Sequence, residues 1–528
     1  MRNPKISALV LLSMASSLVF VHCDSLKDSP SAEDAGGSAG SGSPPGDAAD
    51  PDASGSTEGG APADGSVSDD ASRDGSVDGD APESADAEAD TATDLSVPEY
   101  FLARFALALD SIRWGEFHAH STYSIDANLC GQTSPEGTLG PAEAYAYARD
   151  DEQLDFVGLS DHAEQPNPLA RPLAHKAQDL SVWESVIQTS IEANNEDPSQ
   201  GKVFIVFVGW EYTNTYGLDG SDAQGYGHKN VLFKSLDPSS LPQERISSSN
   251  ATGVYAPTAA ELYSELEDYR PGCAGCSSTA FTIVHTPANA YESNGQPNAG
   301  DHRVDWDVVD PDFVRHVEIA SKWGASEGPQ PLHCTGEDPE FEYVSNPEAD
   351  PLAIRATLHQ RWVEQGNEAF ALAFVGGTDA HNGRPGNDAV PVCGMEHRGA
   401  VTGILAPELT RESLWDGLWS RHTLASQTGL PRFGILMALE TETEHLLMGD
   451  IGQSSSQARV RAVADVAAQR LDLIVDGCFE RSVDGNELDA IIHLGPGRHY
   501  VYVRAATGTA SPDGERRAWS TPVYLRGS

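Results

Sequence analysis

Basic residues are scarce in this sequence. Its 528 residues include 33 lysines and arginines but 80 aspartates and glutamates, which gives a formal net charge of −47. A chain this acidic repels anionic polymers at long range, so we do not expect nucleic acid as a partner. A small anionic substrate is still compatible with the charge, because bound metal ions reverse the local field.

Several familiar motifs are also missing. Neither a serine-nucleophile elbow between a strand and a helix nor a phosphate-cradling glycine loop appears. The CxxC motif of Cys273 and Cys276 lacks a second pair, which weakens a zinc hypothesis and favours a loop disulfide. In an oxidising compartment the other four cysteines of the exported part can also form disulfides, but the sequence does not assign their pairing. They are Cys130, Cys334, Cys393 and Cys478.

Apolar side chains are too few in residues 24–94 to form a core, since this segment consists mainly of small residues with 19 acidic and two basic ones. It predicts a disordered acidic tether. Before it, a basic start and a mostly apolar stretch indicate an export signal over residues 1–23. The signal ends at Cys23 in a sequence that resembles a bacterial lipoprotein processing site. We expect a protein of the bacterial cell envelope, attached to the membrane only through lipid on Cys23; ordinary cleavage with loss of Cys23 is the alternative.

The remaining chain divides into two parts that differ in their pattern of apolar runs. Over residues 95–429, apolar runs alternate with helical stretches such as 141–150 and a helix capped by Thr410 that ends at Trp419. This alternation predicts an α/β fold with parallel strands. Over residues 430–528, short strands follow one another with only turns between them, which predicts a small antiparallel β-sandwich. The oligomeric state is not predicted.

Five apolar runs in the first of these parts end at or beside a histidine or an acid. They are residues 154–162, 203–211, 280–285, 313–321 and 371–381. Ahead of them, His118 and His120 are spaced so that both side chains leave the same face of a strand, and Asp379 and His381 repeat that spacing. If the strands form a barrel, these groups meet at its carboxyl end. Imidazoles and carboxylates in such numbers predict a site for more than one metal ion.

The motifs HAHSTYSIDA, LSDH, GWE, HKNVLF, VHTP, VEIAS and GTDAHNGRPG follow one another in the order typical of a known group. Together they resemble the polymerase-and-histidinol-phosphatase (PHP) superfamily, in particular its large exported branch with a C-terminal β-sandwich. The resemblance runs from about residue 112 to the end of the chain. It implies a distorted seven-stranded PHP-type barrel with two or three divalent ions, zinc, manganese or iron, at its mouth.

The resemblance also implies the roles of individual residues. A first ion would be held by His118, His120 and Glu211, with Asp379 nearby; Glu211 would bridge to a second ion on His285. The third would be held by Asp126, His162 and His381. Glu318 is either a further ligand or an acid that orients one, and His228 either binds metal or faces the substrate. The predicted metal ligands are therefore His118, His120, Asp126, His162, Glu211, His285, Glu318, Asp379 and His381.

Divalent ions in such a site activate water to hydroxide and hold substrate oxygens, which predicts an exported metal-dependent hydrolase, most simply a phosphoesterase. Asp161 or Asp379 would accept the proton. Phosphate oxygens would be bound by Lys229, Lys322, Arg384 and Arg398, for which a surface position is the plain alternative. Three aromatic residues near the ligands, Trp210, Tyr212 and Trp323, are expected to pack in the core. Hydrolysis of C–N or carboxylic-ester bonds, or a non-catalytic binding protein on the same scaffold, are the alternative functions.

Overall fold

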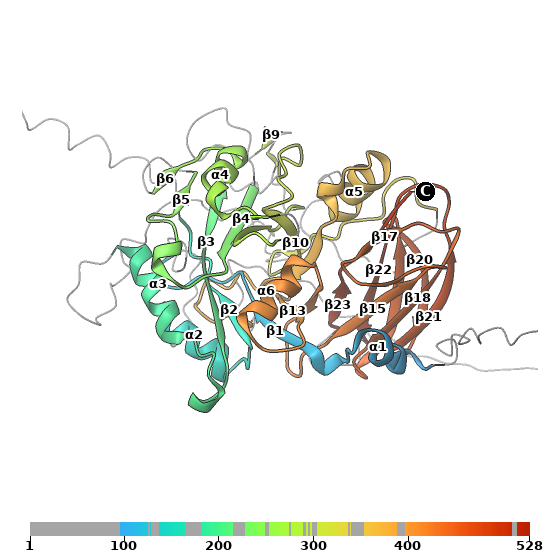
Figure 1. The fold of residues 1–528 in the computed structure, drawn as a ribbon, viewed down its shortest axis with the longest axis horizontal. Coiled ribbons are helices and arrows are strands. Elements are labelled where there is room, and N and C mark those ends of the chain that lie inside the picture. Colours follow the sequence, from blue (N-terminus) through green and yellow to red (C-terminus); the bar gives the residue numbers. More distant parts are fainter. Residues whose placement is uncertain are drawn as a thin grey trace, which may run out of the picture. The chain divides into compact units, whose positions relative to one another are not determined.

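The computed structural model describes most of the chain from Leu95 onward. The described residues are 95–124, 127, 137–163, 181–214, 227–248, 253–273, 276–288, 292–293, 296–297, 304–335, 338, 353–387, 397–508 and 515–527. They form a mixed α/β structure with one large sheet and a separate four-stranded antiparallel sheet (Figure 1). Within these residues, no helix combines the length and the apolar character needed to cross a membrane.

The first part of the large sheet contains the predicted strands. β1 (Ile112–Glu116), β2 (Phe156–Gly158) and β3 (Ile205–Asn214) run parallel to one another. β7 (Ala280–Val284), β10 (Val314–Ser321) and β12 (Ala373–Gly376) form a second parallel set. These strands are almost wholly buried, which explains why they appear in the sequence as continuous apolar runs.

Two strands depart from the predicted parallel pattern. β4 (Gly227–Phe233) lies between β3 and β7 and is antiparallel to both, and β13 (Ala400–Leu405) is antiparallel to β1. The strand order from β10 to β13 is β10-β7-β4-β3-β2-β1-β13, with β12 paired to β10. The sheet is therefore mixed, and the closed seven-stranded barrel stays a prediction.

Helices cover this sheet. α2 (Pro141–Asp150) and α6 (Arg411–Trp419) occupy the predicted residues, and the Thr410 side chain caps α6 by accepting from the Ser413 backbone. α3 (Val182–Ala193) begins with a capping box at Ser181. The shorter helices are α4 (Ala259–Glu265), α5 (Ile354–Leu358) and the π-helix at His359–Glu364. One-turn 3-10 helices lie at Leu109–Ser111, Pro198–Gln200, Pro238–Ser240, Glu267–Tyr269 and Glu368–Phe370. This part also contains short strands of two residues each. They are β5 (Ile246–Ser247), β6 (Val254–Tyr255), β8 (Glu292–Ser293), β9 (Gln296–Pro297) and β11 (Gly324–Ala325).

The C-terminal part is built of strands, as predicted. One sheet has the order β16-β15-β18-β21, from β15 (Ile435–Glu440), β16 (His445–Leu447), β18 (Gln457–Ala464) and β21 (Glu487–His493). The facing strands are β17 (Ile451–Gln453), β19 (Ala468–Val475), β20 (Cys478–Asp484), β22 (His499–Thr507), β23 (Arg517–Ser520) and β24 (Val523–Arg526). Apolar side chains from the two layers share one buried cluster. The pair β17–β24 is parallel, so the arrangement is not purely antiparallel.

The large sheet continues across the predicted boundary at residue 430. β14 (Thr423–Gln427) pairs with β13 on one side and with β23 on the other. A single buried apolar cluster also joins Ile319 and Phe374 to Tyr502 and Trp519. Residues 95–528 consequently share sheet and core, and the domain boundary at residue 430 stays a prediction that these contacts do not favour.

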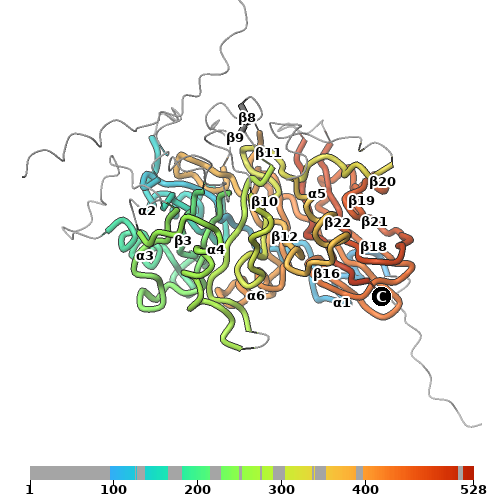
Figure 2. The backbone as a smooth tube through the Cα atoms, turned by 90° about the horizontal axis from the view of Figure 1, so that it is seen from above, coloured from blue at the N-terminus to red at the C-terminus, as the bar shows by residue number. Residues whose placement is uncertain are grey.

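The chain enters this structure through α1 (Val97–Phe105), which lies beside the C-terminal strands in Figure 2. The Tyr100 hydroxyl is 2.9 Å from Nδ1 of His445, and the guanidinium of Arg461 lies 4.0 Å from the centre of the Tyr100 ring. α1 is thus fixed to β16 and β18.

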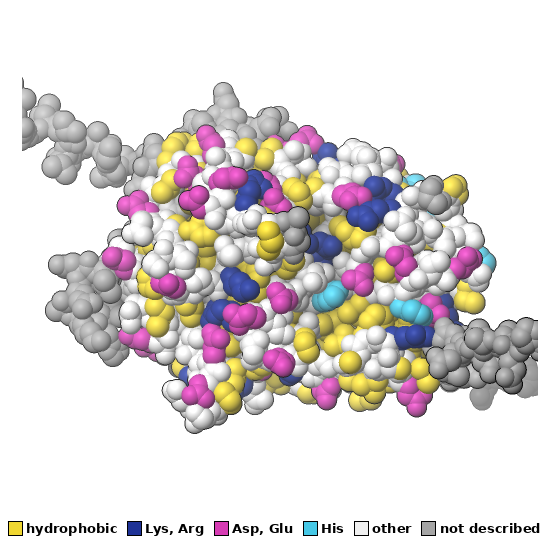
Figure 3. All heavy atoms as spheres, viewed as in Figure 1, with side chains coloured by type: hydrophobic (Ala, Val, Ile, Leu, Met, Phe, Trp, Pro, Cys, Tyr) yellow, Lys and Arg dark blue, Asp and Glu magenta, His cyan; other side chains and the backbone are white. Residues whose placement is uncertain are grey.

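Two disulfides are present. Cys273 is bonded to Cys276, as the sequence favoured, and Cys334 is bonded to Cys478, a pairing that the sequence left open. Cys130 and Cys393 lie outside the described residues. On the face drawn in Figure 3, acidic side chains are scattered among smaller groups of lysine and arginine.

Candidate metal centre

Glu211 lies at the centre of a group of histidines. It is buried in β3, and cross-strand pairing puts it opposite Asn230 of β4. Its Oε2 atom is 3.2 Å from Nε2 of His120 and 3.4 Å from Nε2 of His118. Its Oε1 atom faces three more imidazoles, with distances of 2.7 Å to His228 Nδ1, 3.4 Å to His162 Nδ1 and 3.4 Å to His285 Nε2.

Asp379, in the loop after β12, contacts two of the same histidines and one more. Its Oδ1 atom lies 3.1 Å from Nε2 of both His118 and His120, and 3.5 Å from Nδ1 of His381. Asp379 follows β12 and has a φ of 51°, in the left-handed region that a non-glycine residue adopts only when its surroundings hold it there. Its backbone N–H donates to the His118 carbonyl at 2.8 Å, which ties this bend to the histidine pair.

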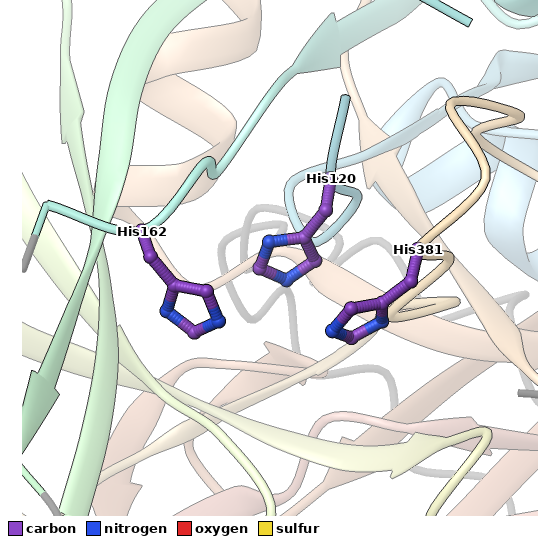
Figure 4. A group of neighbouring side chains, drawn as sticks. All are labelled: His120, His162 and His381. Carbon is purple, nitrogen blue, oxygen red and sulfur yellow. The ribbon is translucent and has the colours of Figure 1, made fainter. Parts of the chain in front are cut away.

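Three overlapping groups have the geometry of metal ligands. They are His118, His120 and Asp379; His118, Glu211 and His285; and His120, His162 and His381. Within each group the ligand atoms lie within 4.8 Å of one another, and every residue is buried. Figure 4 shows the rings of the third group turned toward a common point. One imidazole nitrogen binds one ion, so groups that share His118 or His120 are partly alternatives. The two oxygens of Glu211 face different histidines, and such a carboxylate can hold two adjacent ions.

The chemistry of the buried atoms fits metal ions. Nε2 of His118, Oε2 of Glu211 and Oδ1 of Asp379 are buried, and none has a hydrogen-bond partner within the part of the chain that the structure describes. Burial raises the pKa of Glu211, but His162 and His285 beside it lower that pKa well below its usual value. Two ionised carboxylates among imidazole nitrogens, shielded from water, are costly unless cations compensate them.

Three of these histidines, His118, His120 and His162, are each oriented by a further polar group. His118 Nδ1 lies 2.7 Å from Oε2 of Glu318, and His120 Nδ1 lies 2.9 Å from the Ser124 hydroxyl. His162 Nδ1 lies 2.5 Å from the Thr213 hydroxyl. Of the two roles that the sequence left open for Glu318, the geometry favours the orienting one. Such outer partners fix the ring and its tautomer, as they do around most protein-bound metals.

His228 lies 2.7 Å from Glu211 on the same inner face. It contacts a predicted metal ligand, and both roles that the sequence left open for it stay predictions. Burial is the largest influence on its pKa, which lies below the usual value.

Asp161 has a different position from the one expected of a proton acceptor. Its Oδ1 accepts from the Ser121 backbone at 2.7 Å and its Oδ2 from the Ser121 hydroxyl at 2.8 Å. Both oxygens are therefore engaged by the turn that follows His120. The catalytic role stays a prediction for Asp161, and its contacts support a structural one.

The four residues predicted to bind phosphate lie in different surroundings. Lys229 pairs with Tyr212 across the strands, on the face opposite His228, and burial lowers its pKa to about 7. Arg384 donates to the carbonyls of Gly137 and Asn382, and Arg398 to that of Thr428. Lys322 is buried directly after β10, beside the strand end that presents Glu318. Phosphate binding stays a prediction for all four residues.

The roles of two residues near the centre were not recognised from the sequence. Glu116, at the end of β1, accepts from the backbone N–H and hydroxyl of Thr378 and from the backbone N–H of Gly386, and so holds the loop that presents Asp379. Burial raises its pKa to about 8. Trp323 was expected to pack, but its indole N–H donates to Oδ2 of Asp379. The sequence did offer a signal for Glu116, because an acidic residue ends β1 two positions before His118.

Trp210 and Tyr212 do pack in the core, as expected. Asp126 and Cys23 lie outside the described residues, so their predicted roles are not tested.

Comparisons with known proteins give distant likenesses. No protein-family model matches the chain. An uncharacterised protein of Chlamydia pneumoniae is 23% identical over 341 residues, which are 63% of this chain and 43% of that protein. The chain thus spans less than half the length of that relative. Among solved structures, a two-domain protein of Bacteroides vulgatus, described as containing a predicted PHP-like metal-dependent phosphoesterase, is 15% identical with a TM-score of 0.35. That match covers 80% of this chain and 97% of the other.

Proposed function

We propose that this protein is a metal-dependent hydrolase that cleaves phosphoesters at a centre of two or three divalent ions. The observation that carries the proposal is the position of Glu211. Its Oε2 faces His118 and His120 while its Oε1 faces His162 and His285, so ions bound at these two oxygens would be neighbours. Neighbouring divalent ions supply water activation and charge stabilisation to a displacement at phosphorus.

The chain's own residues would hold and organise that centre. His118, His120, Glu211, His285, Asp379, His162 and His381 would bind the ions. Glu318, Ser124 and Thr213 would fix the rings of the histidines they contact. His228 lies next to Glu211 and is placed to exchange a proton with a group entering beside it. Lys322 would attract an anionic substrate to the same strand end.

The test is a substrate panel with a metal-binding control. The purified full chain, loaded with manganese or zinc, is assayed against phosphomonoesters, phosphodiesters, amides and carboxylic esters. We expect phosphoester turnover that is lost with chelator and restored by metal. Turnover of amides or carboxylic esters alone would assign the centre to the other hydrolase chemistry, and the absence of any bound ion after reconstitution would overturn the proposal.

We also propose that the protein is exported and held at the membrane by lipid on Cys23. The basic start and the apolar stretch of residues 1–23 support export. The disulfides Cys273–Cys276 and Cys334–Cys478 suit an oxidising compartment. Cys23→Ser is expected to move the protein from the membrane fraction to the soluble fraction of cells; a wild-type protein that is already soluble and begins after residue 23 would contradict lipidation.

A further inference from the structure

The two carboxylate oxygens of Asp379 face different partners. Oδ1 faces the Nε2 atoms of His118 and His120, at 3.1 Å from each. Oδ2 accepts a hydrogen bond from the indole N–H of Trp323. A carboxylate held at one oxygen cannot rotate freely, so Oδ1 stays directed at the point where the ligand atoms converge.

Trp323 belongs to a turn that the C-terminal strands hold. It lies between β10 and β11, and the chain then reaches Glu327, which is 1% exposed. The Glu327 carboxylate accepts from the Tyr502 hydroxyl at 2.6 Å, from the Trp519 indole at 2.8 Å and from Arg504 Nη1 at 3.1 Å. All three donors lie on β22 and β23.

The strand that carries Asp379 is held by the same part of the chain. The Tyr524 hydroxyl donates to the Leu372 carbonyl at 2.6 Å, just before β12. Within β12, the Phe374 backbone N–H donates to the Thr521 hydroxyl at 2.9 Å. Both partners of the Asp379–Trp323 hydrogen bond are therefore attached to the C-terminal strands by buried polar contacts.

Burying a carboxylate removes a charged group from water, which costs free energy that an apolar side chain of the same volume does not cost. Apolar side chains of similar volume commonly give equal or greater stability than a buried ion pair, whereas directional hydrogen bonds fix one arrangement of the groups. Glu327 receives three donors from three different residues, which determines the position of its backbone. Its main chain is only a few residues from Trp323.

We propose that Trp323 is a positioning residue for the metal ligand Asp379, and that the C-terminal strands set its position through Glu327. The C-terminal part is then a component of the metal centre and not a separate binding module. This inference rests on the proposed metal-dependent function, since it assigns a role toward the ions that Asp379 would bind.

The test compares metal affinity between matched variants of the full chain. Trp323→Phe removes the donor to Asp379 and keeps an aromatic ring, and Tyr502→Phe removes one donor to Glu327 and keeps the packing. Tyr100→Phe is the control, because it also removes a buried tyrosine hydroxyl from a hydrogen bond to the C-terminal strands, but this hydroxyl lies on α1 and contacts His445 of β16, not Glu327. Affinity for Mn²⁺ is measured by titration of the metal-free protein, well below the unfolding temperature of every variant.

We expect Trp323→Phe to weaken the binding of one ion by about tenfold or more, the range found for outer partners of metal ligands. Tyr502→Phe should weaken the same ion by a smaller factor, and Tyr100→Phe should leave all affinities at the wild-type value. Co²⁺ absorption provides a second readout, since a displaced carboxylate changes the ligand field. Equal effects of Tyr502→Phe and Tyr100→Phe would mean general destabilisation and would overturn the inference.

A double-mutant cycle tests whether Glu327 acts on the metal centre through Trp323. If Glu327 acts through Trp323, the loss of affinity in Trp323→Phe, Glu327→Gln should be smaller than the product of the two single losses. Independent losses that multiply would overturn the link through Glu327. Tight metal binding that Trp323→Phe leaves unchanged would overturn this inference alone, whereas a wild-type chain that binds no ion would overturn the proposed function together with it.

Discussion

Glu318 determines which nitrogen of His118 faces the other ligands. Its Oε2 atom lies 2.7 Å from Nδ1 of His118, while Nε2 of the same ring faces Glu211 and Asp379. An ionised carboxylate can only accept, so Glu318 favours a hydrogen on Nδ1 and leaves Nε2 as the nitrogen directed at the other ligands. Burial lowers the pKa of His118, but Asp379 and Glu318 raise it well above its usual value, so an ion that binds Nε2 would replace a proton there.

We expect Glu318→Gln to weaken metal binding by about ten- to a hundredfold, because the amide can also donate and no longer fixes the His118 tautomer. The measurement is the Mn²⁺ dissociation constant of the full chain. Glu261→Gln, at an exposed position of α4, is the control and should bind as the wild type does. An unchanged affinity in Glu318→Gln would show that other contacts fix the ring.

His118→Ala and His381→Ala, made separately, should each lower hydrolytic activity by at least about a hundredfold, since a displaced ion loses both water activation and substrate orientation. The two should differ in bound metal. His118 faces both Glu211 and Asp379, whereas His381 faces Asp379, so elemental analysis should find the larger loss in His118→Ala. Folding is checked by far-ultraviolet circular dichroism, and full activity in both folded variants would contradict the ligand assignment.

A histidine far from the metal centre predicts a pH dependence of stability. His499 Nδ1 lies 2.7 Å from Oδ2 of Asp476. Burial lowers the pKa of His499, but the hydrogen bond to Asp476, the charge of Asp476 and the bond to the Gly495 carbonyl together outweigh burial and raise the pKa above its usual value of 6.5. Protonated His499 therefore stabilises the fold fully below that usual value, and this contribution disappears as the pH rises through the raised pKa.

His499→Gln should accordingly lower the urea midpoint more at about pH 6 than at about pH 9, relative to the wild type at each pH. His493→Gln, on the exposed side of β21, serves as the control for a histidine without such a partner. An equal loss at both pH values would show that the His499–Asp476 pair does not depend on its charge.

Limited proteolysis should yield residues 95–528 as one resistant fragment, with cleavage concentrated in residues 24–94. Leu430 is exposed, but β14 just before it is paired with β23, and a common core joins the chain on both sides; these contacts resist the local unfolding that cleavage at residue 430 requires. Mass spectrometry of the products is the measurement. Release of a stable fragment that begins near residue 430 would instead support the independent sandwich predicted from the sequence.

The sequence predicted what depends on local pattern. Apolar runs that end at Glu211, His285 and Asp379 located the strands and the candidate ligands near their ends, because burial and strand ends are visible along the chain. The cap at Thr410 likewise marked the start of α6. Lys229 was misleading, because its neighbourhood in the sequence includes His228 while its side chain leaves the other strand face.

Contacts between distant segments could not be predicted in the same way. Glu116 reaches Thr378 and Gly386, and Trp323 reaches Asp379, only after β1, β10 and β12 have been brought together. A single buried glutamate or tryptophan gives no periodic signal of its partner. The continuation of the sheet through β14 and β23 was hidden for the same reason, since strand pairing leaves no mark in either strand alone.

The docking of α1 decides where a mechanical load would enter the protein. A pull on residues 1–94 arrives at Leu95 and passes into α1, which the contacts of Tyr100 with His445 and Arg461 fasten to β16 and β18. Those strands belong to the four-stranded sheet, which contains none of the metal-ligand residues identified above. Tension on the N-terminal chain is thus borne by α1 and the sheet on which it rests, before it can reach β1 and the histidines that follow it.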